Sequence, residues 1–218
     1  MLFGITLEKI LVRLFIAVCI LPVHEFAHAY TAYRLGDKTA KLSGRMTLNP
    51  LAHIDPVGFF LMLFVGVGYA KPVPVNMRYF NRAKRKRNMA IVSLAGPVSN
   101  LIMSFVFLFL SNGVLYLSDG FSGITYTVYT MLFYAATINV SLAVFNLIPI
   151  PPLDGSRILS VIIPDKYYYK IMEYERYLIL VILVLAFMGV LSGPISEISA
   201  IIIGLFDKIT SLPFTAIG

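Results

Sequence analysis

Long apolar runs separated by short polar segments dominate this chain, and they predict a helical membrane protein. The clearest runs predict helices over residues 6–34, 89–117 and 124–148. Each is longer than the roughly 20 residues that are needed to cross a bilayer core. Another span is predicted to begin within 178–191 and to break at Gly193-Pro194, with 195–206 either spanning as a return leg or not spanning. We therefore expect an all-α polytopic membrane protein with about four to six transmembrane helices.

Two shorter patterns lie between the first two runs. Residues 38–49 alternate between polar and apolar positions around Ser43-Gly44, which predicts a small membrane-associated β-hairpin. Residues 58–69 are apolar but too few for a complete span, and basic residues flank them on both sides. Because positively charged flanks stay on the cytoplasmic side, this second pattern predicts a re-entrant segment that enters the membrane and returns.

Composition and charge agree with a membrane protein. The 218 residues are 58% hydrophobic and 13% charged, whereas about 25% of residues are charged in soluble domains. This predicts a single membrane-embedded domain over residues 1–218. The net charge is +7, but the basic residues gather at the ends of apolar runs, most densely at 82–87. There they anchor a chain in a lipid bilayer, so we expect no nucleic-acid partner.

The segment His24-Glu25-Phe26-Ala27-His28 lies in the first predicted helix and carries the clearest chemical signal. Residues four apart on a helix share a face, so the two imidazoles can close on one Zn²⁺. Glu25 borders that face and can act as a general base on a metal-bound water. Pro22 is expected to kink the helix just before the motif. The alternative is a pair of helix histidines satisfied by neighbouring groups.

A catalytic zinc site usually has three protein ligands, so a third must come from elsewhere in the chain. Asp154 is the strongest candidate, because it follows a proline-rich stop at the inner end of the third predicted helix. It could instead cap a following helix or pair with Arg157. His53, together with Asp55, either touches the metal region or fixes a loop, and the loop role is the simpler interpretation. The single cysteine excludes a cysteine-based zinc site.

Several groups of residues together resemble the site-2 protease family of intramembrane zinc metalloproteases, peptidase family M50. The motif at 24–28 is followed far downstream by Asn146-x-x-Pro149-x-x-x-x-Asp154-Gly155. Further segments are similar to the compact bacterial and archaeal branch without a PDZ domain: Asn-Pro-Leu-Ala-His-Ile-Asp-Pro at 49–56, Ala-Lys-Pro-Val-Pro-Val-Asn at 70–76, Ala95-Gly96-Pro97-x-x-Asn100 and Pro151-Pro152-Leu153-Asp154-Gly155-Ser156-Arg157. The resemblance implies a catalytic core at about 6–160, followed by C-terminal helices at 165–218.

The resemblance also implies the chemistry of the site. One Zn²⁺ per chain would be held by His24, His28 and Asp154, and Glu25 would activate the bound water as the nucleophile.

Three more roles concern the substrate and the support of the site. Asn146 would orient the substrate backbone or stabilise the oxyanion. Asn100 would support the metal-binding helix through a hydrogen bond across the bundle. The predicted hairpin at 38–49 would pair with an unwound substrate strand.

The implied function is hydrolysis of peptide bonds in or near transmembrane segments of membrane proteins. The implied location is a prokaryotic cell membrane, with the site towards the cytoplasm. A transmembrane protein substrate and the lipid bilayer are the expected partners, while a homo-oligomer or a regulatory membrane partner is left open. Two alternatives come from other classes: a membrane metal transporter, and a catalytically silent pseudoprotease that binds membrane helices.

Overall fold

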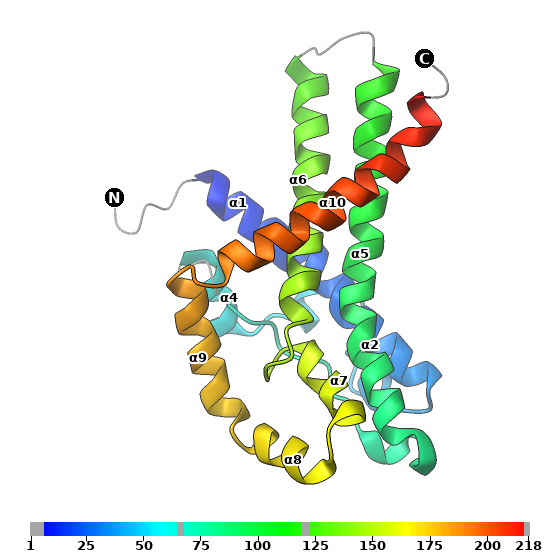
Figure 1. The fold of residues 1–218 in the computed structure, drawn as a ribbon, viewed down its shortest axis with the longest axis vertical. Helices are drawn as coiled ribbons and strands as arrows, with labels where there is room; N and C mark the ends of the chain where they lie inside the picture. Colours follow the sequence, from blue (N-terminus) through cyan, green and yellow to red (C-terminus); the bar gives the residue numbers. More distant parts are fainter. Residues whose placement is uncertain (1–6, 65–67, 119–122, 216–218) are drawn as a thin grey trace. The chain divides into compact units, whose positions relative to one another are not determined.

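The computed structural model describes residues 7–64, 68–118 and 123–215, and the regular elements in these residues are all helical (Figure 1). The α-helices are α1 Leu7–Phe15, α2 Leu21–Arg34, α3 Thr39–Leu42, α4 Pro56–Phe64, α5 Arg85–Leu117, α6 Gly123–Asn146, α7 Asp154–Ile162, α8 Asp165–Glu173, α9 Glu175–Phe187 and α10 Ser192–Thr215. Short 3-10 turns lie at Pro50–Ala52, Met77–Tyr79 and Arg82–Lys84. The prediction of an all-α chain is confirmed for the described residues.

Four stretches of described helix are long and apolar enough to cross a bilayer: Lys9–Arg34, Arg82–Leu117, Gly123–Asn146 and Ser192–Thr215. The first three match predicted helices. The fourth corrects the prediction for the C-terminal region. The helical structure is interrupted between α9 and α10, and Gly193-Pro194 lies inside α10. Gly189 has φ of 73°, a left-handed conformation that ends helices. Pro194 lies in the first turn of α10, where a missing amide hydrogen breaks no helical hydrogen bond.

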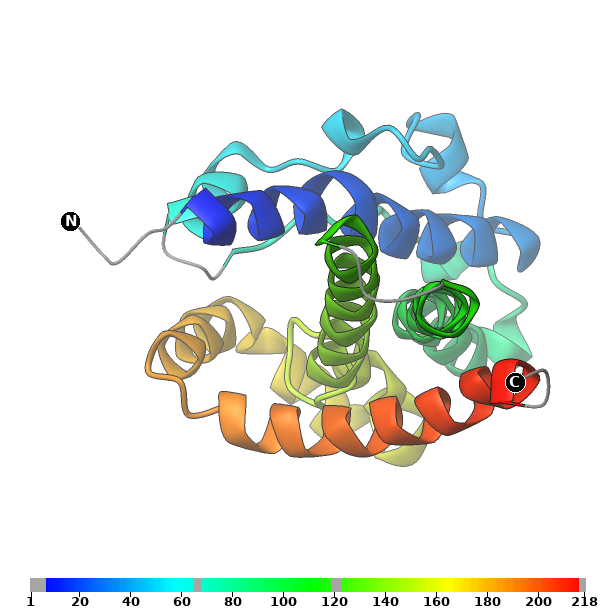
Figure 2. The same ribbon diagram turned by 90° about the horizontal axis from the view of Figure 1, so that it is seen from above.

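The first candidate span is one helical run through α1, a π-helical turn at Ile16–Ile20, and α2 (Figure 2). Pro22 has no amide hydrogen, so the regular hydrogen bond to the preceding turn cannot form there. The π-helical turn ends directly before α2 begins, so the helix is irregular at the place where the proline predicts it. The motif at 24–28 follows on regular α-helix.

The β-hairpin predicted over 38–49 does not form in this structure. Thr39–Leu42 is the short helix α3, and no strand occurs among the described residues. The physical reason is Asp37, whose Oδ1 accepts a hydrogen bond of 2.9 Å from the backbone N–H of Thr39. Such a side-chain bond starts a helical turn, and here it outweighs the alternating pattern.

The segment predicted to re-enter the membrane begins with α4 and then doubles back. Asp55 starts the helix, because its Oδ1 accepts hydrogen bonds from the backbone N–H groups of Val57 at 3.0 Å and Gly58 at 2.9 Å. A Cβ built on Gly58 would lie 2.0 Å from the carbonyl oxygen of Tyr69, so the returning chain passes directly against α4. Residues 65–67 of this prediction lie outside the described residues.

The chain forms two compact units. The first consists of Met1–Pro97 and Asn146–Leu191, and the second of Val98–Phe145 and Ser192–Gly218. Helix α5 therefore begins in the first unit and continues in the second. A single membrane-embedded domain over residues 1–218 stays a prediction.

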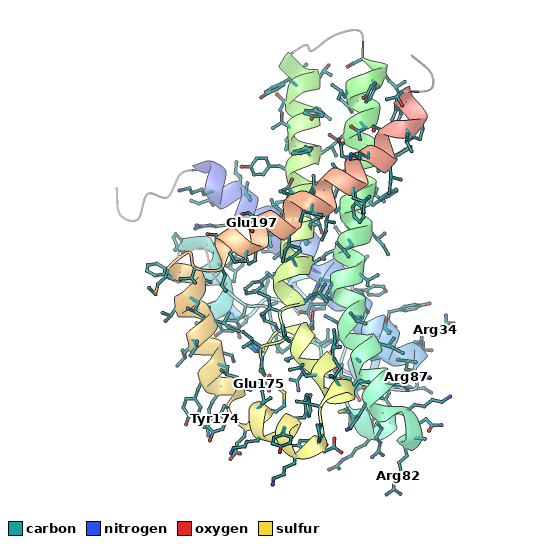
Figure 3. The ribbon with its side chains drawn as sticks, in the orientation of Figure 1. Arg34, Arg82, Arg87, Tyr174, Glu175 and Glu197 are labelled. Carbon is teal, nitrogen blue, oxygen red and sulfur yellow. The ribbon has the colours of Figure 1, made fainter. Side chains whose placement is uncertain are left out.

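A small core in the first unit fixes the end of α2 against the start of α5. Ala32 of α2, Phe80 of the preceding connection and Val92 of α5 are each at most 2% exposed and pack together. Basic residues cluster at these same helix ends, where Figure 3 labels Arg34 and Arg82. The predicted basic cluster is thus at one end of the first unit.

In the second unit, α10 turns polar side chains towards α5. The side-chain amide of Asn112 donates hydrogen bonds of 3.0 Å to Asp207 Oδ1 and to Thr210 Oγ1. The exposed side of α10 carries apolar residues: Ile198, Ile201, Leu205, Ile209 and Leu212. Polar residues inside and apolar residues outside are expected for a helix that lies in lipid.

Candidate metal centre

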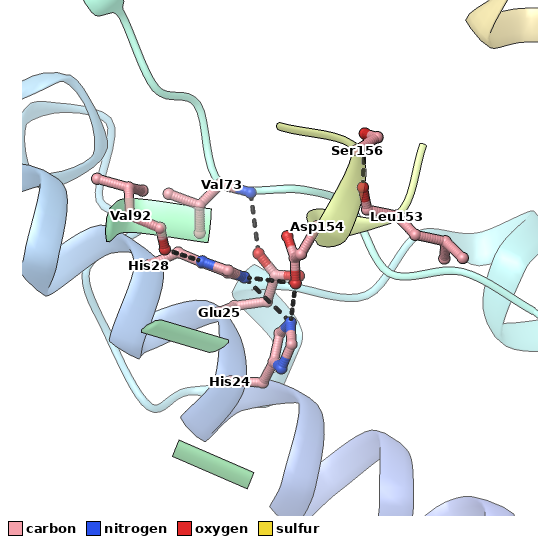
Figure 4. A network of polar contacts seen from close by, with 8 residues as sticks. All are labelled: His24, Glu25, His28, Val73, Val92, Leu153, Asp154 and Ser156. Carbon is pink, nitrogen blue, oxygen red and sulfur yellow. Dashed lines mark hydrogen bonds and ion pairs between the residues drawn. The ribbon is translucent and has the colours of Figure 1, made fainter. Parts of the chain in front are cut away.

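The imidazoles of His24 and His28 lie on one face of α2, as their spacing predicts (Figure 4). Their Nε2 atoms are 3.0 Å apart, and the residues are only 5% and 8% exposed. Asp154, the first residue of α7, faces both of them. Its Oδ2 lies 3.2 Å from each Nε2. The structure therefore brings together the three residues predicted to bind the metal.

The alternative roles of Asp154 do not match its surroundings. Leu153 occupies the capping position before α7, and no side chain caps this first turn. Arg157 pairs with Glu175 of α9 at 3.0 Å instead of with Asp154. The carboxylate of Asp154 is thus left facing the two histidines.

The three facing atoms fit a tetrahedral Zn²⁺. Bonds of about 2.0–2.1 Å at tetrahedral angles place ligand atoms about 3.3 Å apart, and the three separations here are 3.0, 3.2 and 3.2 Å. Asp154 Oδ2 is buried and accepts no hydrogen bond within the described part of the chain. When Nε2 of both histidines carries no hydrogen, three acceptor atoms converge here, which suits a cation.

One main-chain carbonyl sets the orientation of His28. Its Nδ1 lies 2.7 Å from the carbonyl oxygen of Val92 in α5. A carbonyl oxygen can only accept, so Nδ1 carries a hydrogen, and in the neutral imidazole Nε2 then keeps its lone pair for a metal. The core contact between α2 and α5 therefore also fixes a ligand.

The ionisation of Asp154 favours cation binding. Burial alone would raise the pKa of this carboxyl, but the imidazoles of His28 and His24 hold it below its usual range. The carboxyl group is therefore ionised, which is the state that binds a metal.

Glu25 lies beside the cluster without joining it. Its Oε2 accepts a hydrogen bond of 3.0 Å from the backbone N–H of Val73, and the three ligand atoms come from other residues. A carboxylate next to the ligands, but outside their set, is the arrangement that a general base requires.

The other predicted site residues have different surroundings. His53 Nε2 lies 2.8 Å from the carbonyl oxygen of Thr47, and His53 is outside the ligand cluster found among the described residues. Together with the bonds of Asp55 at the start of α4, this contact favours the loop role. Asn146 ends α6 in the first unit, whereas Asn100 lies in the second. The roles predicted for these two asparagines stay predictions.

Two contributors to the site were missed by sequence reasoning, namely Val73 and Val92. Both act through main-chain atoms, so their side-chain identity carries no signal for the role. Gly96 belongs to the motif Ala95-Gly96-Pro97-x-x-Asn100, and the structure explains why a glycine is needed at this position. A Cβ built on Gly96 would lie 2.4 Å from His28 Nε2 and 2.6 Å from His24 Nε2, so only glycine lets α5 approach the imidazoles.

Comparison with known proteins identifies relatives of the chain. The sequence model of peptidase family M50 matches residues 12–131 and 112–191. The chain is 42% identical to the "Putative zinc metalloprotease YwhC" of Bacillus subtilis (strain 168) over 170 residues, which make up 75% of this chain and 74% of that protein. It is 33% identical to the "Putative zinc metalloprotease Rip2" of Mycolicibacterium smegmatis, over 62% of this chain and 51% of that protein. It is 28% identical to the "Zinc metalloprotease MJ0392" of Methanocaldococcus jannaschii, over 72% of this chain and 35% of that protein. No solved structure matches the chain.

Proposed function

Because the chain belongs to peptidase family M50, the site-2 protease family, we propose that it is an intramembrane zinc metalloprotease. The proposed reaction is hydrolysis of peptide bonds in or near the transmembrane segments of membrane proteins. The observation that carries the proposal is the cluster of His24, His28 and Asp154. Both histidines lie within a helix long and apolar enough to cross a bilayer, so the chemistry would take place at membrane depth.

The proposed mechanism divides the work between the ligands and Glu25. The two histidines and Asp154 would hold Zn²⁺, which, when bound, supplies a Lewis acid that acidifies water and polarises the scissile carbonyl. Glu25 accepts one proton from the attacking water. It then donates a proton to the amine nitrogen as the peptide C–N bond breaks. Burial of Glu25, at 9% exposed, keeps this transfer away from bulk solvent.

A substrate in this mechanism must expose its backbone. Helical segments hide their carbonyl oxygens in hydrogen bonds, so a transmembrane substrate has to unwind before it is attacked. Asn146 is proposed to hold the unwound backbone or the oxyanion. Its support is its position at the end of α6, where the turn that leads to Asp154 begins.

The proposed orientation places the site towards the cytoplasm of a prokaryotic cell. The support is Arg34 at the end of α2 and the basic cluster at 82–87 that leads into α5, since positive residues stay on the cytoplasmic side (Figure 3 labels Arg34, Arg82 and Arg87). His28 lies in the same half of α2 as Arg34, and its side chain is hydrogen-bonded to Val92, near the beginning of α5.

Reconstitution tests the proposal. The purified chain is placed in liposomes with a single-span reporter protein and assayed for cleavage before and after chelation. We expect cleavage that chelation abolishes and that added Zn²⁺ restores. Zinc flux across the bilayer without any cleavage would favour a transporter and contradict the proposal. Stoichiometric zinc without cleavage of any single-span reporter would favour a silent helix-binding protein.

A further inference from the structure

Val73, whose backbone N–H donates to Glu25, lies in an extended segment, residues 71–76, that we call the strap (Figure 4). Pro72 and Pro74 lie on either side of Val73, and neither has an amide hydrogen. Val73 therefore supplies the one backbone N–H at the centre of the strap, and this N–H points at the carboxylate of Glu25.

The strap is fixed on both sides of Val73 by bonds that do not involve the metal ligands. On one side, the N–H of Lys71 donates to the carbonyl oxygen of His53 at 2.8 Å. On the other, the N–H of Asn76 donates to Asp37 Oδ2 at 2.6 Å. Asp37 is fully buried, three residues after the end of α2. The position of the Val73 N–H is thus set in advance, which is what a group that orients a reacting side chain needs.

We propose that the main-chain N–H of Val73 is the positioning group for Glu25. This inference rests on the proposed function, in which Glu25 transfers the proton. The bond holds Oε2 at the strap and leaves Oε1 to exchange protons with water and the leaving amine. A carboxylate that is not held can turn and bind zinc, because glutamate oxygen is itself a common zinc ligand. The strap therefore keeps Glu25 beside the ligands but outside their set.

A matched pair of variants tests the contribution of the Val73 backbone N–H separately from that of the Val73 side chain. Val73→Pro removes the N–H, whereas Val73→Ala keeps it and shortens the side chain. We expect Val73→Pro to lower kcat by about 100-fold, the loss typical of a misplaced reacting group, with KM and zinc stoichiometry unchanged. Val73→Ala should remain near the wild type. In Co²⁺-loaded protein, the visible absorption should change in Val73→Pro only, since that variant frees Glu25 to alter the coordination.

A second measurement does not depend on activity or on a proline substitution. Hydrogen–deuterium exchange of a peptide that covers the strap reports few amides, because two of its residues are prolines. We expect the Val73 amide to exchange at least tenfold faster in Glu25→Ala than in the wild type. In Glu25→Gln it should stay protected, because the amide oxygen can still accept the bond. The Asn76 amide, held by Asp37, is the internal control and should not change.

Equal exchange of the Val73 amide in Glu25→Ala and the wild type would overturn the proposal. A folded, zinc-loaded Val73→Pro variant with wild-type kcat would overturn it as well. Failure of the proposed function looks different: either the wild type would cleave no single-span reporter, or Glu25→Gln would retain full cleavage, whatever the exchange of the strap.

Discussion

Gly96 lies directly against the imidazole of His28, at a distance that leaves no room for a side chain. A Cβ at this position would come within 2.4 Å of His28 Nε2. Gly96→Ala must therefore displace either the ligand or α5, at a cost of about 1–3 kcal/mol for overpacking. Expressed as zinc affinity, this is a loss of roughly 5- to 150-fold, which a competition titration with a chelating dye measures.

The control for this substitution is Gly204→Ala in α10. Apart from the adjacent backbone of α10, no heavy atom of the described residues lies within 4 Å of a Cβ built there, so zinc affinity should equal that of the wild type. Equal affinities of Gly96→Ala and Gly204→Ala would show that α5 does not approach the imidazoles as closely as described.

Asp154 and Asp165 form a natural pair for testing the third ligand. Each is the first residue of its helix, α7 and α8, but Asp154 faces the histidines and Asp165 pairs with Lys86. Asp154→Asn should lose most of its zinc at stoichiometric loading, because a neutral amide is a poor ligand and the cluster loses its negative charge. Asp165→Asn should retain one zinc per chain. Metal analysis of the two purified variants measures the zinc bound per chain. Full zinc in Asp154→Asn would exclude Asp154 as a ligand.

The polar contacts between α5 and α10 should contribute to the stability of the second unit. Asp207→Leu removes the acceptor of the 3.0 Å bond from Asn112, and such bonds in membranes are worth about 0.6–2 kcal/mol. Asp207→Asn keeps a carbonyl oxygen at that position and should be close to the wild type. Thermal unfolding in detergent micelles measures both. An unchanged unfolding midpoint in Asp207→Leu would contradict the contribution.

Local patterns in the sequence predicted much of the site because its chemistry depends on spacing. The four-residue interval of His24 and His28 places them on one face of any helix, whatever surrounds it. Asp154 was found through the prolines that end the preceding helix. The long apolar runs likewise predicted three of the helices that can span a membrane, since burial in lipid depends mainly on length and composition.

The errors arose where one contact decided between two conformations. The alternation at 38–49 favoured strands, but the hydrogen bond from Thr39 to Asp37 starts α3 instead. At the C-terminal end, Gly193-Pro194 looked like the break, whereas the left-handed Gly189 ends the helix first. The N–H of Val73 could not be predicted, because its role depends on a fold-back that brings the strap to α2.

The most direct test of the account is the rate of reporter cleavage by Glu25→Gln, measured with zinc content on the same preparation. The substitution keeps the size of the side chain and leaves His24, His28 and Asp154 in place. We predict one zinc per chain and a cleavage rate lower by about 100-fold or more, the range expected for loss of general acid–base catalysis. A zinc-loaded Glu25→Gln protein that cleaves the reporter as fast as the wild type would contradict the account.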